Sequence, residues 1–260
     1  RSEFDKLISC RAPAKALEML EQYGIMSVIM PELSPIFGMP DNSSNRGSVW
    51  QHTLRTVKAM ADISSDVNMR LAALLCDAGK AVAYTRHENG KVTFPRHDRR
   101  AAPVIDPAMK RLRYEPKIIN DIIFLARNHT AAKKWGDNAE HMSDADLRSL
   151  QYLCETRDRF ERLLTLIHAD NLSHPERPSL AGQVPAIRKR AAEFKASGTE
   201  MFGFNLPIQS PHIRKLLQIQ PGRKVELCKD YLMKCAFENP KLNREKCRRL
   251  LLEKFSREAR

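Results

Sequence analysis

The sequence predicts an all-α protein, a multi-helix array whose last part is a basic helical region. Hydrophobic residues recur at helical spacing in almost every segment of the chain. Only residues 91–94, which follow an Asn89-Gly90 turn signal, have the character of a strand or hairpin. The chain has 260 residues, of which 42% are hydrophobic and 29% charged. This is the composition of a soluble globular protein with a sizeable core.

Helices are expected where a hydrophobic stripe lies between capping signals. Leu54, Val57 and Met60 form one such stripe, and the nearly continuous apolar run 69–76 predicts a buried helix. Ser143 is a typical N-cap because acidic residues follow it in the first turn. Residues 37–47 have the composition of an exposed loop. The predicted helices span 13–23, 50–61, 69–76, 117–128, a segment that begins at Ser143, 157–171, 186–197, 211–217, 221–237 and 243–255.

The charge of the chain is large and uneven. The formal net charge is +13, and residues 177–260 hold 19 lysines and arginines against 8 acidic residues. Such a charge favours a polyanionic partner, and nucleic acid before a membrane, because neither a basic amphipathic anchor nor a membrane-spanning apolar run is present. A lysine or arginine taken singly is also explained by a solvated helix face. The candidate RNA-binding residues are Arg188, Lys189, Arg190, Lys195, Arg214, Lys215, Arg223, Lys224, Arg248 and Arg249.

Cysteine usage indicates reduced thiols. The six cysteines are scattered without CxxC spacing, and no signal peptide precedes them. We therefore expect a cytoplasmic protein. Because the chain begins at Arg1, we also expect it to be a piece of something longer.

Five imidazole and carboxylate side chains follow one another in an order that predicts a metal site. The apolar run before Asp77 delivers this acid to the end of a helix. His52 and Asp170 lie on other predicted helices, and the three side chains could converge on a divalent ion. His97 and His129 could hold a second ion or bind a substrate phosphate. Each histidine taken alone is more often a structural residue than a ligand.

This order resembles the HD superfamily of metal-dependent phosphohydrolases, which is named for a His-Asp pair where this chain has Cys76-Asp77. The resemblance implies a divalent metal: magnesium, manganese or zinc. Cys76 could ligate zinc as a thiolate, or it could simply be a small buried apolar residue. His97-Asp98 does not fit the motif, because no apolar helix precedes it. The pair Asp144 and Asp146 caps a helix, whereas nucleotidyl transferases hold metals on a strand edge.

A wider resemblance covers nearly the whole chain. It is carried by four groups of segments: PAKALEML, Gly24 and PEL in 13–33; QHTL and RLAALLCDAGK in 51–80; GKVTF, His97, RLRY and Asn128-His129 in 90–129; and LPI, IQPG and ENP in 206–240. The chain resembles the portion of bacterial CCA-adding tRNA nucleotidyltransferases and poly(A) polymerases that follows the catalytic head. The resemblance implies a neck-like helical segment over 1–47, an HD-like helical domain over 48–175 and a basic helical tail over 176–260.

What the resemblance implies for function is an RNA-binding role. The nucleotide-adding site of the family lies in a head with a Gly-rich strand-turn and a metal-binding Asp pair, and neither occurs in this sequence. We therefore expect the chain to bind tRNA or other RNA without adding nucleotides itself. The alternative is a divalent-metal phosphohydrolase of nucleotides or phosphate esters. Two departures weigh against it: Cys76, and the prolines Pro103 and Pro107, which predict a short, kinked or displaced helix after His97.

Overall fold

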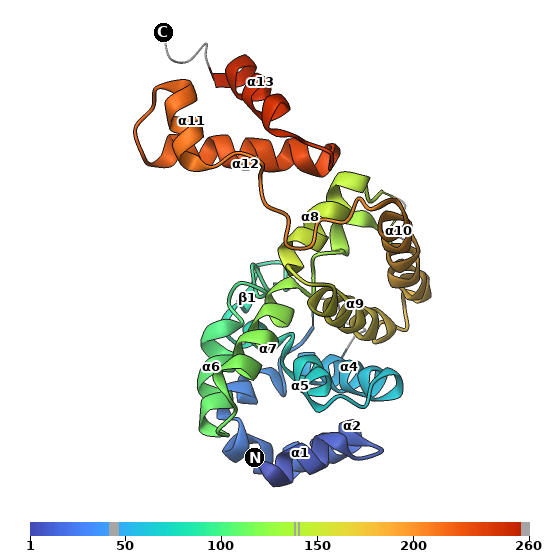
Figure 1. Cartoon of the computed structure of the whole chain (residues 1–260). Helices are drawn as coiled ribbons and strands as arrows, with labels where there is room; N and C mark the ends of the chain where they lie inside the picture. Colours follow the sequence, from blue (N-terminus) through green and yellow to red (C-terminus); the bar gives the residue numbers. More distant parts are fainter. Residues whose placement is uncertain (42–46, 138, 140, 256–260) are drawn as a thin grey trace. The chain divides into compact units, whose positions relative to one another are not determined.

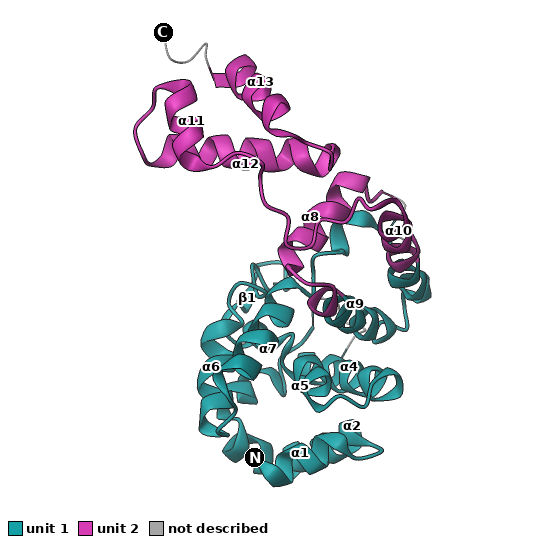
Figure 2. Ribbon diagram, in the orientation of Figure 1, with its two compact units in different colours: residues 1–140, 161–185 teal, residues 141–160, 186–260 magenta. Residues whose placement is uncertain are grey.

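The computed structural model describes residues 1–41, 47–137, 139 and 141–255, and within them the all-α prediction is confirmed (Figure 1). Residues 42–46 of the expected loop lie outside the described part. The contacts divide the chain into two compact units (Figure 2). Unit 1 comprises Arg1–Glu140 and Glu161–Pro185, and unit 2 comprises His141–Phe160 and Ala186–Arg260. The division into domains at 47 and 175 stays a prediction.

Unit 1 is a stack of helices with one small hairpin. The hairpin is the strand signal expected near residue 91, and it pairs Thr85 with Thr93 in antiparallel register. The elements are α1 (Ser2–Ser9), α2 (Pro13–Gln22), α3 (Ile25–Ile29), η1 (Pro31–Ile36), α4 (Val49–Ile63), α5 (Val67–Leu75), η2 (Ala78–Val82), β1 (Thr85–Arg86), β2 (Val92–Thr93), α6 (Ala102–Arg111), α7 (Pro116–Asn128), η3 (Lys133–Trp135), most of α9 (Arg157–Leu172) and η4 (Pro178–Gly182).

The apolar helix α5 forms the centre of unit 1. Every residue from Met69 to Leu75 is buried, including Arg70, and the nearly continuous apolar run predicts a buried helix here. The helix packs against α1, α4 and α7. A helix that is covered on all sides has a fixed position, so the residues that follow its end are held in fixed positions too.

One buried arginine ties the first helix of the chain to this centre. Arg70 of α5 donates hydrogen bonds to the carbonyl oxygens of Ile8 and Cys10 at the end of α1, at 3.0 Å each. It also donates to Ser64 at 3.0 Å and to Ala61 at 3.3 Å, at the end of α4. The carbonyls at the end of a helix have no partner within it, so a single guanidinium satisfies two helix ends at once.

The helix after His97 forms despite its prolines. It is α6, ten residues long. Pro103 lies in its first turn, where the missing N–H has no intrahelical acceptor to lose. Only Pro107 lies inside it. The expectation of a short helix agrees with this element. The helices α1 and α3 have no counterpart among the predicted segments.

Unit 2 contains α8 (Asp144–Cys154), the first turn of α9, most of α10 (Gln183–Ser197), α11 (Ser210–Leu217), α12 (Arg223–Glu238) and α13 (Arg244–Phe255). The last three helices share a hydrophobic core that includes Ile213, Leu232 and Leu251. Helix α8 packs against α12. There Arg148 donates to the carbonyl of Phe237 at 2.8 Å.

Two expectations concern the chain as a whole. All six cysteines lie in the described part of the chain, and they form no disulfide bond there. Among the described residues, we find no helix with the length and apolar character that crossing a membrane requires.

Replacing Arg70 with alanine should lower the free energy of unfolding by about 3 kcal/mol, because four carbonyl oxygens lose a charged donor. Urea denaturation measures the change. Arg11→Ala is the matched control, since Arg11 is exposed, and it should change the stability by less than about 0.5 kcal/mol. Equal effects of the two variants would contradict the anchoring role of Arg70.

Candidate metal centre

Five elements of unit 1 deliver the five side chains predicted as metal ligands. His52 lies on the inner face of α4, whose first turn is fixed by a capping box between Ser48 and Gln51. The others follow or end elements: Asp77 comes after α5, His97 after β2, His129 at the end of α7 and Asp170 near the end of α9.

Asp77 lies at the centre of this cluster. Its Oδ2 atom is 3.2 Å from His52 Nε2. Its Oδ1 atom is 3.3 Å from His97 Nε2 and 3.5 Å from His129 Nε2. Asp170 Oδ1 is 3.1 Å from the same His52 nitrogen. The fold therefore brings together all five side chains that the sequence singled out.

Backbone acceptors fix the orientation of two of these imidazoles. His97 Nδ1 donates to the carbonyl of Phe94 at 3.1 Å, and His129 Nδ1 donates to that of Ala126 at 2.7 Å. In a neutral ring, Nε2 then carries the lone pair, and both lone pairs face Asp77. Within the described chain, His97 Nε2, His129 Nε2 and Asp77 Oδ1 are buried and make no hydrogen bond. Three acceptors that converge in a buried space attract a positive charge, and a metal ion fits this arrangement.

His52 has the same kind of orientation. The hydroxyl of Ser173 donates to the carbonyl of Asp170 at 2.6 Å, so His52 Nδ1 donates to Ser173 Oγ at 3.1 Å. Its Nε2 atom faces the carboxylates of Asp170 and Asp77. Burial lowers the pKa of His52, but hydrogen bonds with these two carboxylates raise it, to about 9 overall. The position between the two carboxylates thus attracts a positive charge, either a second proton on the ring or a metal ion.

Lys80 is a charged member of the cluster that sequence reasoning missed as a site residue. Its buried Nζ atom lies 3.0 Å from Asp77 Oδ2 and 3.4 Å from Asp41 Oδ1. Burial raises the pKa of Asp77, yet the ammonium of Lys80 and the neighbouring imidazoles hold it well below its usual range. The buried carboxylates of Asp41, Asp77 and Asp170 outnumber this ammonium, so the cluster attracts further positive charge. A proton on His52 or a metal ion would supply it.

Cys76 takes no part in the arrangement. Its thiol is buried and donates to the carbonyl of Ala73 at 3.4 Å. Burial, with the charge of Asp77, raises the pKa of the thiol well above its usual value, so no thiolate forms. The candidate metal groups among the described residues do not contain it. Of the two interpretations, the small buried apolar residue is the one that fits.

His174 is a second residue that sequence reasoning missed. Its Nε2 atom lies 3.9 Å from Asp170 Oδ1, and its ring centroid lies 4.8 Å from that of His52. The three form one candidate metal group, and Asp77, His97 and His129 form another. Burial lowers the pKa of His174, which keeps its imidazole neutral. The signal in the sequence was its position four residues after Asp170, one helical turn further along the chain.

Gly79 allows the two sides of the cluster to approach. A Cβ atom at this position would lie 2.0 Å from the carbonyl oxygen of His97 and 2.8 Å from the backbone nitrogen of Ala101. Glycine is therefore needed for close backbone packing. Its place just after Asp77 sets the distance between that carboxylate and the His97 segment.

The candidate RNA-binding residues all lie in unit 2 and differ in exposure. Arg190 donates to the carbonyl of Met142 and to Asp144, 2.7 Å away, so it has a structural role. Asp146 forms a capping box with Ser143, which agrees with the capping interpretation of this acidic pair. The half-buried candidates are Arg188, Arg190 and Arg214. The exposed ones are Lys189, Lys195, Lys215, Arg223, Lys224, Arg248 and Arg249.

Comparison with known proteins agrees with the fold and the cluster. Residues 1–37 match the family described as a probable RNA and SrmB-binding site of polymerase A, and residues 49–173 match the HD domain. The class is thus an all-α protein whose residues 49–173 match the HD domain and whose preceding segment matches the family of that description.

The relatives narrow the class. The CC-adding tRNA nucleotidyltransferase of Thermus thermophilus is 23% identical over 97% of this chain and 55% of its own length. The Multifunctional CCA protein of Neisseria meningitidis serogroup A is 31% identical over 42% of this chain and 25% of its own length. The Multifunctional CCA protein of Alkalilimnicola ehrlichii is 30% identical over 47% of this chain and 29% of its own length. This chain is therefore similar in sequence to proteins of these names, over 97% of its length in one case and over less than half in the other two. It spans about half or less of these relatives.

Replacing Gly79 with alanine should lower the free energy of unfolding by about 2 kcal/mol, because backbone atoms must move to admit the new Cβ. Thermal and urea denaturation would show it. Gly182→Ala is the control, since a Cβ there meets nothing within 4 Å. An unchanged stability of Gly79→Ala would contradict the close-packing role.

Proposed function

We propose that this chain is the tRNA-binding portion of a tRNA nucleotidyltransferase, with its nucleotide-adding site outside residues 1–260. The observation that carries the proposal is the match of residues 1–37 to the family described as a probable RNA-binding site. In addition, 97% of the chain aligns with a CC-adding tRNA nucleotidyltransferase. In this proposal the RNA phosphates are bound by basic side chains of the chain.

The exposed cations of unit 2 support this role. Lys215 lies on α11, Arg223 and Lys224 begin α12, and Arg248 and Arg249 lie on α13. Exposed lysines and arginines attract phosphates through charge alone, so they supply affinity without reading the base sequence.

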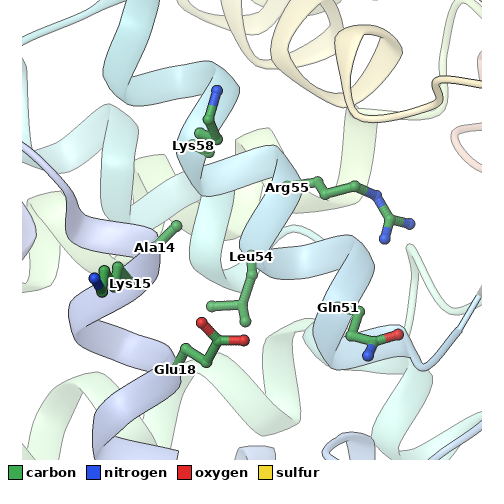
Figure 3. Close-up of a pocket in the computed structure, with 7 residues that line it drawn as sticks. All are labelled: Ala14, Lys15, Glu18, Gln51, Leu54, Arg55 and Lys58. Atoms are coloured by element: carbon green, nitrogen blue, oxygen red, sulfur yellow. The ribbon is translucent and has the colours of Figure 1, made fainter.

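A basic cleft in unit 1 supports the same role (Figure 3). It has a volume of about 430 Å³ and lies where α2, from the segment that matches the RNA-binding family, packs against α4. Three cationic side chains and a single carboxylate line it. The lining residues are Ala14, Lys15, Glu18, Gln51, Leu54, Arg55 and Lys58.

Purified chain should bind tRNA, and the affinity should fall steeply between about 50 and 200 mM salt. The double variant Arg223→Glu/Lys224→Glu should weaken binding about tenfold or more at low salt. It should also lower the slope of log affinity against log salt by about one for each phosphate that the variant no longer neutralises. Filter binding or fluorescence anisotropy measures both quantities.

The matched control reverses two exposed charges in unit 1, Arg86→Glu/Lys91→Glu. An equal loss in both double variants would contradict the tail as the main binding surface. The whole proposal fails if the unaltered chain has no measurable affinity for tRNA at low salt.

The cluster around Asp77 favours a second candidate function, a divalent-metal phosphohydrolase. The observation that carries it is the convergence of two imidazole lone pairs on an Asp77 oxygen without a hydrogen-bond partner in the described structure. When bound, a divalent ion polarises a phosphoryl oxygen and lowers the pKa of water. Asp77, His97 and His129 would hold one ion, and His52 and Asp170 lie where they could hold another.

The donor set bears on the identity of the metal. Imidazole nitrogens suit zinc and other transition metals, whereas magnesium prefers oxygen ligands and keeps several waters. Each of the two groups contains two histidines and one aspartate. Among magnesium, manganese and zinc, this set favours zinc, because manganese, like magnesium, prefers oxygen ligands. Lys80 keeps Asp77 ionised and ready to bind such an ion.

Asp77→Asn should lower the metal affinity by about 100-fold or more, since changes even outside the ligand shell cost 10- to 100-fold. Elemental analysis and calorimetric titration with zinc and manganese measure it. Manganese-dependent hydrolysis of a generic phosphodiester should disappear in parallel. His212→Ala, at an exposed histidine of α11, should change neither. The second function fails if the unaltered chain takes up no metal and hydrolyses no phosphodiester.

A further inference from the structure

The HD motif has a histidine at the position of Cys76, and this chain lacks it. A different histidine, His174, lies beside the predicted ligands His52 and Asp170. The buried thiol of Cys76 contacts the carbonyl of Ala73 and belongs to neither candidate metal group of the described residues. His174, which follows the end of α9, lies next to both His52 and Asp170. We propose that His174 supplies the ligand lost at position 76, so that a divalent ion is held by His52, Asp170 and His174. This inference rests on the second candidate function.

The distances in this group suit an ion. Two ligand atoms that are each about 2.1 Å from a tetrahedral zinc ion lie about 3.4 Å apart. His52 Nε2 and Asp170 Oδ1 are 3.1 Å apart, and Asp170 Oδ1 and His174 Nε2 are 3.9 Å apart. The three ligand atoms all lie within 4.8 Å of one another. Small side-chain movements would bring them to coordination distance.

The backbone holds His174 on the side of α9 that carries Asp170. The amide of Ser173 donates to the carbonyls of Ala169 and Asp170, and that of His174 donates to Asn171. The helical turn therefore continues beyond Leu172, and residues four apart in such a turn lie on one face.

A carboxylate orients the ring of His174. Its Nδ1 atom lies 3.3 Å from Glu176 Oε1, so Nδ1 donates there and Nε2 carries the lone pair on the side of Asp170. A carboxylate that accepts from the outer nitrogen of a histidine is the usual support for a metal-binding imidazole. His174 therefore has the position, the orientation and the support of a ligand.

The test compares zinc binding by the full chain and four variants, using calorimetric titration and elemental analysis. His174→Ala should weaken binding at least about tenfold at one site. The double variant Cys76→His/His174→Ala should regain most of the lost affinity, because it restores the motif histidine. His212→Ala should bind as the unaltered chain does, and His52→Ala should lose the same site as His174→Ala.

A second measurement avoids substitution at the buried position 76. In long-range proton–nitrogen spectra of histidine-labelled chain, the Nε2 resonance of His174 should shift when zinc is added. His174→Ala identifies this resonance. The role of His174 is overturned, and the metal function survives, if His174→Ala binds zinc normally. The same holds if zinc leaves the Nε2 resonance of His174 in the unaltered chain unmoved while His52→Ala abolishes zinc binding. If the unaltered chain binds no zinc or manganese, both fall together.

Discussion

The constraint on which unit 1 depends is the burial of the Asp77 carboxylate. Only 2% of this residue is exposed, and a buried charge is costly unless it is paired and hydrogen-bonded. Lys80 and His52 pair with one of its oxygens at 3.0 and 3.2 Å, and His97 and His129 face the other oxygen from two further segments. The position of each of these segments therefore follows from the need to surround one carboxylate. An apolar residue at this position would leave a buried ammonium and several imidazoles without their common partner.

The apolar helix α5 makes this burial possible. Because it is covered on all sides, it carries Asp77 into the interior, and Gly79 lets the His97 segment approach closely. Arg70, on the same helix, satisfies the ends of α1 and α4. One helix thus fixes both the cluster and the N-terminal segment that matches the RNA-binding family. Packing and site share a single origin in the run of residues 69–75.

The charges of the two units serve different chemistry. In unit 1 the carboxylates of Asp41, Asp77 and Asp170 are buried beside the single ammonium of Lys80, which creates a local demand for positive charge. In unit 2 the cations are mostly exposed on α10 to α13, where they are available to a polyanion. Cys76 bears only on the first of these features. The proposed RNA-binding role is therefore independent of whether the cluster holds a metal ion.

The sequence by itself determined the helices with strong hydrophobic periodicity and the residues of the cluster. The apolar run before Asp77 and the order of the histidines are local signals, and they were sufficient to single out all five predicted ligands. The short helices α1 and α3 were missed, because eight and five residues give little periodicity. The two prolines of α6 weakened the helix signal in the sequence, although the folded chain accommodates both of them in a helix.

Only the tertiary structure decided which way the ring nitrogens face and which neighbours complete the cluster. Lys80 and His174 join it because separate elements bring them within reach of Asp77 and Asp170. The interpretation of Cys76 was settled by its burial and its bond to Ala73, and the structural role of Arg190 by its acceptors in α8 and before it. The spacing of residues in a sequence predicts which side chains lie on the same helix or strand. Distances between elements arise only when the chain packs, and the chemistry of a site depends on those distances.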